Sequence, residues 1–341
     1  MESPSVSVVM TIYNGERYLI DSLASIVEQS FQDWELLCVN DGSQDRSGEI
    51  LRWFAECDPR IRILEQENAG IVQAANRGCY AANAPLICRM DCDDIAYPHR
   101  LQVQYDFMRD HPQHVAVGGA ILEIDNDSDP LGLASLPTNH PNIVDNLLTR
   151  RTGLFNPASM LRKSAFEAVG GYRPEFLWVE DHDLWLRLSD EGLLHNLTDL
   201  VLCYRQHATS TCWQRASLQR ELMNQLLTEA YQQRGKSVPP ELLLAEKSYP
   251  KTSAGPGKWA RKAAKGGHVH STFKHLHHLL RSDSKWSYKS RMTFESLLRL
   301  IGGSPRRLIA GSPTVRVPSF PHWHAQHAER TVPRSNPSKA A

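Results

Sequence analysis

Short apolar, β-branched runs alternate with amphipathic segments through the first part of this chain, and this alternation restricts the fold more than any other feature. The apolar runs predict four strands, at Ser5–Ile12, Trp34–Val39, Ile61–Leu64 and Leu86–Met90. Helical spacing of apolar residues predicts helices between them, at Glu16–Gln29, through Ile50, Leu51 and Phe54, and at Ala69–Ala82. Such βαβ units build a parallel sheet that is covered on both faces. The sequence therefore predicts an α/β fold with a mostly parallel central sheet flanked by helices.

The rest of the chain has a mixed pattern and then changes character. Further strands are predicted at Val115–Ile124, Pro157–Leu161 and Thr198–Tyr204, and helices at Arg100–Arg109, Ile143–Arg150, Asp183–Ser189 and Leu218–Gln233. Beyond about Val238, Pro, Ser, Lys and His dominate and apolar periodicity is weak. Short basic amphipathic helices are expected there at Ser271–Leu280 and Arg291–Leu300, with disorder over Ser312–Ala341.

Charge is distributed unevenly along the chain. The 38 Lys and Arg residues balance the 38 Asp and Glu residues, but residues 251–341 hold 17 of the former and only 3 of the latter. An acidic body is thus followed by a basic tail, which is either a solvated extension or a surface for an anionic membrane. Nucleic acid is not expected as a partner, because the body is acidic and the sequence contains no recognisable nucleic-acid-binding module.

Cysteine usage and hydropathy predict the compartment. The seven cysteines are odd in number and form no CxxC pair, which is typical of a reducing compartment. The N-terminus lacks a basic region followed by an apolar one, and no stretch approaches the ~18 apolar residues of a membrane span. The prediction is a cytoplasmic protein, with peripheral contact at the inner face of the cell membrane as an option for its basic tail.

Polar clusters follow three of the predicted strands, where ligands bind in an open parallel sheet. They are Thr11–Glu16, Asn40–Ser43 and Arg89–Asp94, and we expect them to converge in space. No G-x-G-x-x-G follows the first strand, which argues against a dinucleotide fold, and the absence of G-x-x-x-x-G-K-[ST] excludes a P-loop.

Acidic side chains dominate two motifs. Asp91, Asp93 and Asp94 end a predicted strand, where they would repel one another unless a divalent cation such as Mg²⁺ or Mn²⁺ bound them. The alternative is a solvated loop in which Asp94 caps a helix. Glu180 and Asp181 precede an apolar helix that we expect to begin near Asp183. Projecting from a loop, they would be placed to accept a proton from an attacking hydroxyl, or else they simply cap the helix.

Taken in order, the motifs resemble glycosyltransferase family 2, whose members have the GT-A nucleotide-diphospho-sugar transferase fold. The segments that carry the resemblance are VSVVMTIYNGERYLIDSLASIVEQSFQDWELLCVNDGSQDRS, ENAGIVQAANRG, RMDCDDIAYPHRL and NPASMLRKSAFEAVGGYRPEFLWVEDHDLWLRL, together spanning roughly residues 5–210. The resemblance implies a catalytic domain over residues 1–235, with a nucleotide-sugar half (1–110) and an acceptor half (111–235). Residues 236–341 form a basic extension, partly helical and partly disordered, that the resemblance does not cover.

The resemblance also implies roles for single residues. Asp181 is expected to be the catalytic base, with Glu180 beside it. A Mn²⁺ or Mg²⁺ ion is expected on Asp93 and Asp91, with His207 near it. The donor site is expected to involve Thr11, Tyr13, Glu16, Asp41, Asn68, Arg89 and Asp91.

Some positions keep a second interpretation or depart from the family pattern. Asp41 could instead cap the next helix, and Trp178 either stacks on a sugar or packs in the core. Thr11 stands where the family usually has Pro, and Cys92 where Ala is common. Neither departure removes a catalytic group.

The implied activity is an inverting glycosyl transfer. The sugar would pass from a nucleotide donor, with UDP as the expected nucleotide, to a hydroxyl of a glycan or lipid-linked acceptor in the synthesis of a polysaccharide, glycolipid or cell-surface glycan. Two alternatives stay open: a sugar-nucleotide nucleotidyltransferase, and a non-catalytic scaffold that binds nucleotide sugars. The first would need a Gly-rich basic loop after the first strand, and the second would typically have lost one of the carboxylates.

Overall fold

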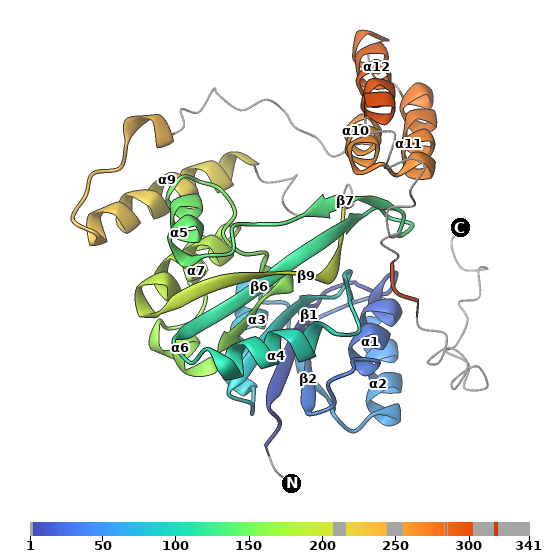
Figure 1. Ribbon diagram of the computed structural model, residues 1–341. Helices are drawn as coiled ribbons and strands as arrows, with labels where there is room; N and C mark the ends of the chain where they lie inside the picture. Colours follow the sequence, from blue (N-terminus) through green and yellow to red (C-terminus); the bar gives the residue numbers. More distant parts are fainter. Residues whose placement is uncertain are drawn as a thin grey trace.

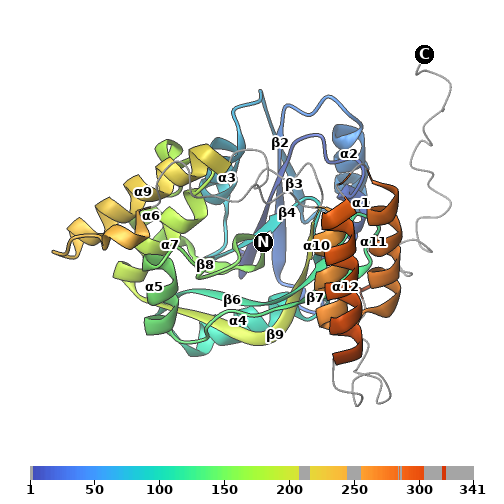
Figure 2. The same cartoon turned by 90° about the horizontal axis from the view of Figure 1, so that it is seen from above.

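The computed structural model describes residues 3–206, 216–243, 255–282, 284, 286–302 and 317–319. Helices cover both sides of a curled central sheet, and a separate group of C-terminal helices lies at one end of it (Figures 1 and 2). The strands are β1 (Val6–Ile12), β2 (Trp34–Asp41), β3 (Ile61–Gln66), β4 (Leu86–Asp91), β5 (Ile95–Ala96), β6 (His114–Ile124), β7 (Pro130–Ala134), β8 (Met160–Arg162) and β9 (Leu193–Arg205). The α-helices described as far as residue 233 are α1 (Leu19–Val27), α2 (Ser47–Cys57), α3 (Ile71–Ala81), α4 (Arg100–Asp110), α5 (His140–Leu148), α6 (Lys163–Ala168), α7 (Glu180–Glu191) and α9 (Ala216–Gln233).

The N-terminal half of the sheet is parallel, as predicted. Strands β3, β2, β1 and β4 lie side by side in this order, and every pair among them is parallel. The sheet continues through β8, β6, β9 and β5, with β7 paired to β6. In this second half β8, β5 and β7 pair antiparallel, and only β6 and β9 are parallel. The short turn between β6 and β7 explains part of this difference, since parallel neighbours need a long crossover.

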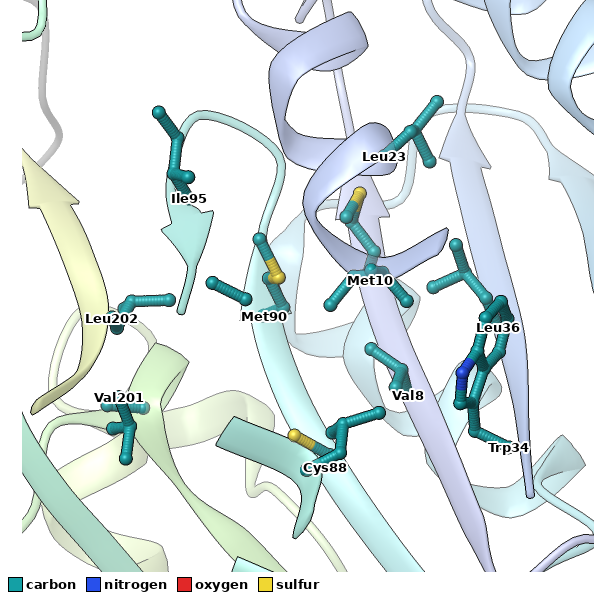
Figure 3. Close-up of a cluster of buried hydrophobic side chains, with 14 of the residues drawn as sticks. Val8, Met10, Leu23, Trp34, Leu36, Cys88, Met90, Ile95, Val201 and Leu202 are labelled. Atoms are coloured by element: carbon teal, nitrogen blue, oxygen red, sulfur yellow. The ribbon is translucent and has the colours of Figure 1, made fainter. Parts of the chain in front are cut away.

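Apolar side chains on both faces of the parallel strands explain why those strands read as continuous hydrophobic runs. On β1, Val8 and Met10 point into a core beneath α1 and α2, together with Leu23, Trp34 and Leu36 (Figure 3). Residues of the opposite face, among them Val9, Leu37 and Ile87, belong to a second core beneath α3, α6 and α7. Burying both faces leaves the strand ends as the place where polar groups can gather.

Two predicted boundaries differ from the structure in ways that affect the site. The first helix begins at Leu19 and not at Glu16, so the segment after β1 is a loop of six residues between Ile12 and Leu19 that includes Tyr13 and Glu16. Helix α7 begins at Glu180 and not near Asp183, so Glu180 and Asp181 lie in its first turn and do not project from a loop. The first turn of a helix favours negative charge, because its backbone N–H groups and dipole point toward it.

The basic C-terminal extension contains three described helices: α10 (Pro256–Gly266), α11 (Val269–Arg281) and α12 (Trp286–Gly302). The last two correspond to the predicted amphipathic helices, while α10 was not predicted. Ala260, Leu276, Leu279 and Met292 form a small core between the three helices. The C-terminal helices lie beside β7 at the edge of the central sheet (Figures 1 and 2). The predicted disorder over Ser312–Ala341 falls outside the described residues, apart from 317–319.

Candidate active site

The loops that follow β1 and β2 are joined by hydrogen bonds. The backbone N–H of Asn14 donates to Ser43 Oγ at 3.1 Å, and that of Gly15 donates to Ser47 Oγ at 2.9 Å. Glu16, an exposed residue, accepts from the N–H of Arg46 at 3.0 Å. Tyr13 lies on the same loop with 52% of its surface exposed. The predicted convergence of the first two polar clusters is therefore observed, and Tyr13 is open to a ligand while the carboxylate of Glu16 holds the two loops together.

Asp41 is buried at the end of β2 and is already well supplied with donors. Its carboxylate accepts the side-chain N–H of Gln66 at 2.6 Å and the backbone N–H groups of Ala69 and Gly70 at 2.8 and 2.9 Å. It thus holds the segment that leads into α3, and not α2, the next helix along the chain. Asn68 lies on this segment and donates to the Asp41 carbonyl at 3.1 Å. The Asp41 carboxylate therefore fixes the conformation of the loop that carries Asn68. Any lone pair that it leaves free is available to accept a hydrogen bond from a ligand.

A glycine makes the close approach of these two segments feasible. Gly42 has φ +71°, and a Cβ there would lie 2.8 Å from the backbone nitrogen of Asn68. A side chain at this position would therefore both strain the backbone and push the loop that carries Asn68 away from β2.

The acidic turn between β4 and β5 brings three carboxylates together. Asp91, Asp93 and Asp94 each offer an oxygen, and these oxygens lie within 4.8 Å of one another. Thr11 is the register partner of Asp91 on β1, so it borders this cluster directly. Asp94 is completely buried, and no helix begins beside it, so the helix-cap alternative does not apply.

The protonation of this turn reflects burial and mutual repulsion. Burial, with Asp93 beside it, raises the pKa of Asp91 to about 6. The same two causes raise the pKa of Asp94 well above its usual range. Carboxylates this close resist ionisation together unless a cation offsets their charge.

The residues of the turn fit a divalent cation. Besides their spacing, Oδ2 of Asp94 is buried and has no hydrogen-bond partner within the part of the chain that is described, while Oδ1 accepts the backbone N–H of Arg205 at 2.8 Å. An orphaned carboxylate oxygen next to two others is the donor set that Mg²⁺ or Mn²⁺ prefers. The sequence predicted Asp94 as part of the acidic triplet, whereas the ligands implied by the family resemblance were only Asp91 and Asp93, with His207 near the ion.

The first turn of α7 brings a second pair of carboxylates, Glu180 and Asp181, near the acidic turn. Burial, and then the neighbouring Asp181, raises the pKa of Glu180 to about 7, and Asp91 contributes in the same direction. Burial also raises the pKa of Asp181. Since Asp181 in turn raises the pKa of Asp91, the two acidic clusters lie close enough to influence each other. The sequence predicted both clusters, and the fold brings them together.

Trp178 enters this helix in a strained conformation. Its φ is +83°, which is unfavourable for a bulky residue, and its backbone N–H donates to the carboxylate of Glu180 at 2.6 Å. Gln219 donates to its carbonyl at 3.1 Å. Strain of this kind persists where the surroundings enforce it, and it concentrates at functional sites.

Asp183 fixes the position of α7. Its fully buried carboxylate pairs with Arg173 on one side and with Arg187 on the other. Arg187 also donates to the carbonyls of Val169 and Gly171 at 2.7 and 2.8 Å. A buried carboxylate held by two guanidinium groups anchors the first turn of the helix against the preceding loop.

Two predicted site residues, Arg89 and His207, are not placed at the ligand-facing surface of the site in the described structure. Arg89 is only 1% exposed: its guanidinium donates to the Val9 carbonyl at 2.6 Å and lies 4.0 Å from the Asp91 carboxylate. It lies under the acidic turn, so in this conformation it reaches Asp91 and not a diphosphate, because β4 directs its side chain into the core. His207 lies outside the described residues.

Comparisons with known proteins identify the family that this chain resembles. A family model for glycosyl transferase family 2 matches residues 7–170. The putative glycosyltransferase EpsE of Bacillus subtilis (strain 168) is 32% identical over 230 residues, which cover 66% of this chain and 80% of EpsE. The O-antigen biosynthesis glycosyltransferase WbnJ of Escherichia coli is 30% identical over 210 residues, covering 60% of this chain and 81% of WbnJ.

A solved structure supports the architecture. The crystal structure of S. aureus TarS superposes with a TM-score of 0.51 at 15% identity, covering 86% of this chain and 54% of the TarS chain. At this identity the likeness concerns the fold, and it confirms the expected GT-A arrangement.

Substitution of Asp91 by Asn should stabilise the metal-free protein at pH 8. The folded pKa of Asp91 is about 6, above the ordinary value, so the stability it contributes is present at low pH and lost as the pH rises through 6. After a discount for its partial exposure, we expect a gain on the order of 1 kcal/mol at pH 8 that disappears near pH 4. Thermal unfolding in EDTA at both pH values measures it, with the exposed Asp145→Asn as control. A lower melting temperature of Asp91→Asn at pH 8 would contradict the electrostatic account.

Proposed function

This chain belongs to glycosyltransferase family 2 and is a glycosyltransferase, and from its site we propose that it transfers a sugar from a nucleotide-diphospho-sugar to an acceptor hydroxyl with inversion. The observation that carries the proposal is the proximity of the Asp91–Asp94 turn to the Glu180–Asp181 pair, since Asp181 raises the pKa of Asp91 and Asp91 raises that of Glu180. An inverting transfer needs these two functions on opposite sides of the anomeric carbon: stabilisation of the leaving diphosphate and removal of the proton from the acceptor.

The donor side is formed by the ends of β1, β2 and β4. Tyr13 and the Asp41–Asn68 wall would receive the nucleoside, with Thr11 beside the diphosphate. Asp91, Asp93 and Asp94 would hold Mn²⁺ or Mg²⁺, which when bound neutralises charge on the departing diphosphate. Arg89 supports the turn from below, where its charge faces Asp91. UDP is the nucleotide that we expect, and the sugar is open.

The acceptor side is the first turn of α7. Asp181 would take the proton of the attacking hydroxyl, because its raised pKa brings it closer to the operating pH, as general-base catalysis requires. Glu180 holds the backbone of Trp178, and we expect it to fix the loop on which an acceptor sugar rests. Trp178 would provide the stacking face.

The alternatives fit the site less well. A nucleotidyltransferase would need a Gly-rich basic loop after β1, where this chain has TIYNGERYL. A scaffold that has lost catalysis would have no reason to keep five acidic side chains crowded in a site that raises the pKa of at least four of them.

Substitution of Asp181 by Asn should remove turnover and leave donor binding intact. The change deletes the proton acceptor without altering size, so we expect a loss of about 10²–10⁴-fold in kcat. Transfer or hydrolysis of the bound donor measures kcat, and calorimetry measures donor affinity. Glu191→Gln, at the exposed end of the same helix, serves as the matched control. If Asp181→Asn kept its activity while Glu180→Gln lost it, the base would be Glu180.

The acceptor is the second part of the proposal. WbnJ carries a name from O-antigen biosynthesis, and we propose a glycan or lipid-linked acceptor of the same broad kind for this chain. No described helix is both long and apolar enough to cross a bilayer. The C-terminal helices offer a different means of reaching a lipid-linked substrate at the cytoplasmic surface of the membrane.

The surface of α11 and α12 combines exposed apolar and cationic side chains. Val269, Phe273 and Leu280 recur at helical spacing on α11, and Phe273 is 54% exposed. On α12, Trp286 and Phe294 are 75% and 64% exposed. Arg281, Arg291 and Arg299 are exposed on the same helices. Apolar side chains flanked by Arg are typical of segments that lie in the interface of an anionic bilayer.

Vesicle flotation tests the membrane contact. The parent should float with vesicles that contain phosphatidylglycerol and not with neutral phosphatidylcholine vesicles, since each Arg near the surface contributes about 1 kcal/mol. The double substitution Phe273→Ser and Phe294→Ser should reduce flotation several-fold. Leu218→Ser, on α9 at the other side of the molecule (Figures 1 and 2), is the control. Equal flotation of all three proteins would refute the contact.

A further inference from the structure

A lysine from the C-terminal helices occupies the centre of an acidic turn on the catalytic domain. The turn joins β6 to β7 and contains Asp125, Asp127 and Asp129. The ammonium group of Lys274 on α11 lies 2.8, 2.9 and 2.6 Å from their carboxylates. His275 lies 2.9 Å from the Asp125 carboxylate. The turn therefore receives its countercharge from a helix almost 150 residues away in the sequence.

The conformation of the turn depends on the same carboxylates. Oδ1 of Asp125 accepts the backbone N–H groups of Asp127 and Asp129, both at 2.9 Å, while Oδ2 faces Lys274. Ser128 has φ +67°, so the turn is held in a conformation that most residues avoid. Without Lys274, three like charges would face one another across this turn, and electrostatic repulsion would favour its opening.

The inner side of the turn is bound by Arg205, the last residue of β9. Nη1 of Arg205 donates to the Asp125 carbonyl and to Ser128 Oγ, both at 3.0 Å. Its Nε donates to the Asp93 carbonyl at 2.8 Å, and its backbone N–H donates to the Asp94 carboxylate at 2.8 Å. The residue is 2% exposed, and its guanidinium stacks over the ring of Tyr18 at 4.3 Å.

We propose that Arg205 is a positioning residue for the Asp91–Asp94 turn, and that the C-terminal helices hold it in place through Lys274. The planar guanidinium has donors in a fixed fork, so the acidic turn between β6 and β7 can fix its orientation, and its Nε then fixes the backbone of Asp93. The proposal rests on the assignment of the Asp91–Asp94 turn as the metal site. It makes the basic extension a structural part of the active site, in addition to any contact with a membrane.

Hydrogen exchange tests the coupling without any metal. Lys274→Met keeps the length of the side chain and removes its charge. It should increase deuterium uptake several-fold in peptides that cover residues 91–96 and 124–130. Lys265→Met, an exposed lysine on α10, makes the same charge change and should leave both peptides as in the parent. Unchanged uptake at residues 91–96 in Lys274→Met would overturn the proposal.

Mn²⁺ binding tests the consequence for the metal site. Titration with Mn²⁺ alone, followed by the electron paramagnetic resonance signal of the free ion, should give about 10-fold weaker binding for Arg205→Lys and for Lys274→Met. Lys274→Arg should restore the affinity, because it restores the charge. Parent-like affinity in both variants would overturn the proposal while leaving the metal site intact. A parent that binds no Mn²⁺ would remove the metal assignment itself, and with it the role of Arg205.

Discussion

The mutual repulsion of carboxylates is the constraint around which this molecule is organised. Asp91, Asp93 and Asp94 converge within 4.8 Å, and the pair on α7 adds to the same negative field. Such a cluster is costly for a metal-free fold, as the raised pKa of Asp91 indicates. Two arginines support the turn: Arg89 lies beneath it and places its charge near Asp91, and Arg205 lies behind it and donates to the Asp93 carbonyl.

The same principle explains the position of the acceptor side. Asp183 is buried between two guanidinium groups, and this fixes the start of α7. The helix can then present Asp181 in its first turn, where backbone N–H groups favour a carboxylate. The left-handed backbone of Trp178 is the strained part of the arrangement, and the carboxylate of Glu180 secures it. The strained conformation lowers the stability of the fold at the place where a ligand would contact the protein, which is the usual trade-off at functional sites.

Local patterns were sufficient to predict the parallel half of the sheet, the acidic triplet and the Glu180–Asp181 pair. They failed where the outcome depends on distant partners. Arg89 follows a strand pattern, but only the fold shows that its side chain is directed into the core. From the sequence alone, Asp94 could equally be a helix cap. The structure excludes this, because the turn that contains Asp94 leads into the strand β5. The pairing of Lys274 with the β6–β7 turn has no signal in a single sequence, because charge recognition between surfaces leaves no periodicity.

Binding of a nucleotide-sugar to the Asp91–Asp94 turn through a divalent cation is the proposal on which the other assignments depend. Calorimetry with a panel of nucleotide sugars, in Mn²⁺, in Mg²⁺ and in EDTA, tests it most directly when parent and Asp93→Ala are compared, with Asp145→Ala as a surface control. We expect that one donor binds the parent only with metal, and that Asp93→Ala binds it at least about 10-fold more weakly. Donor binding that is equal in EDTA and Mn²⁺, or equal in Asp93→Ala and parent, would contradict it.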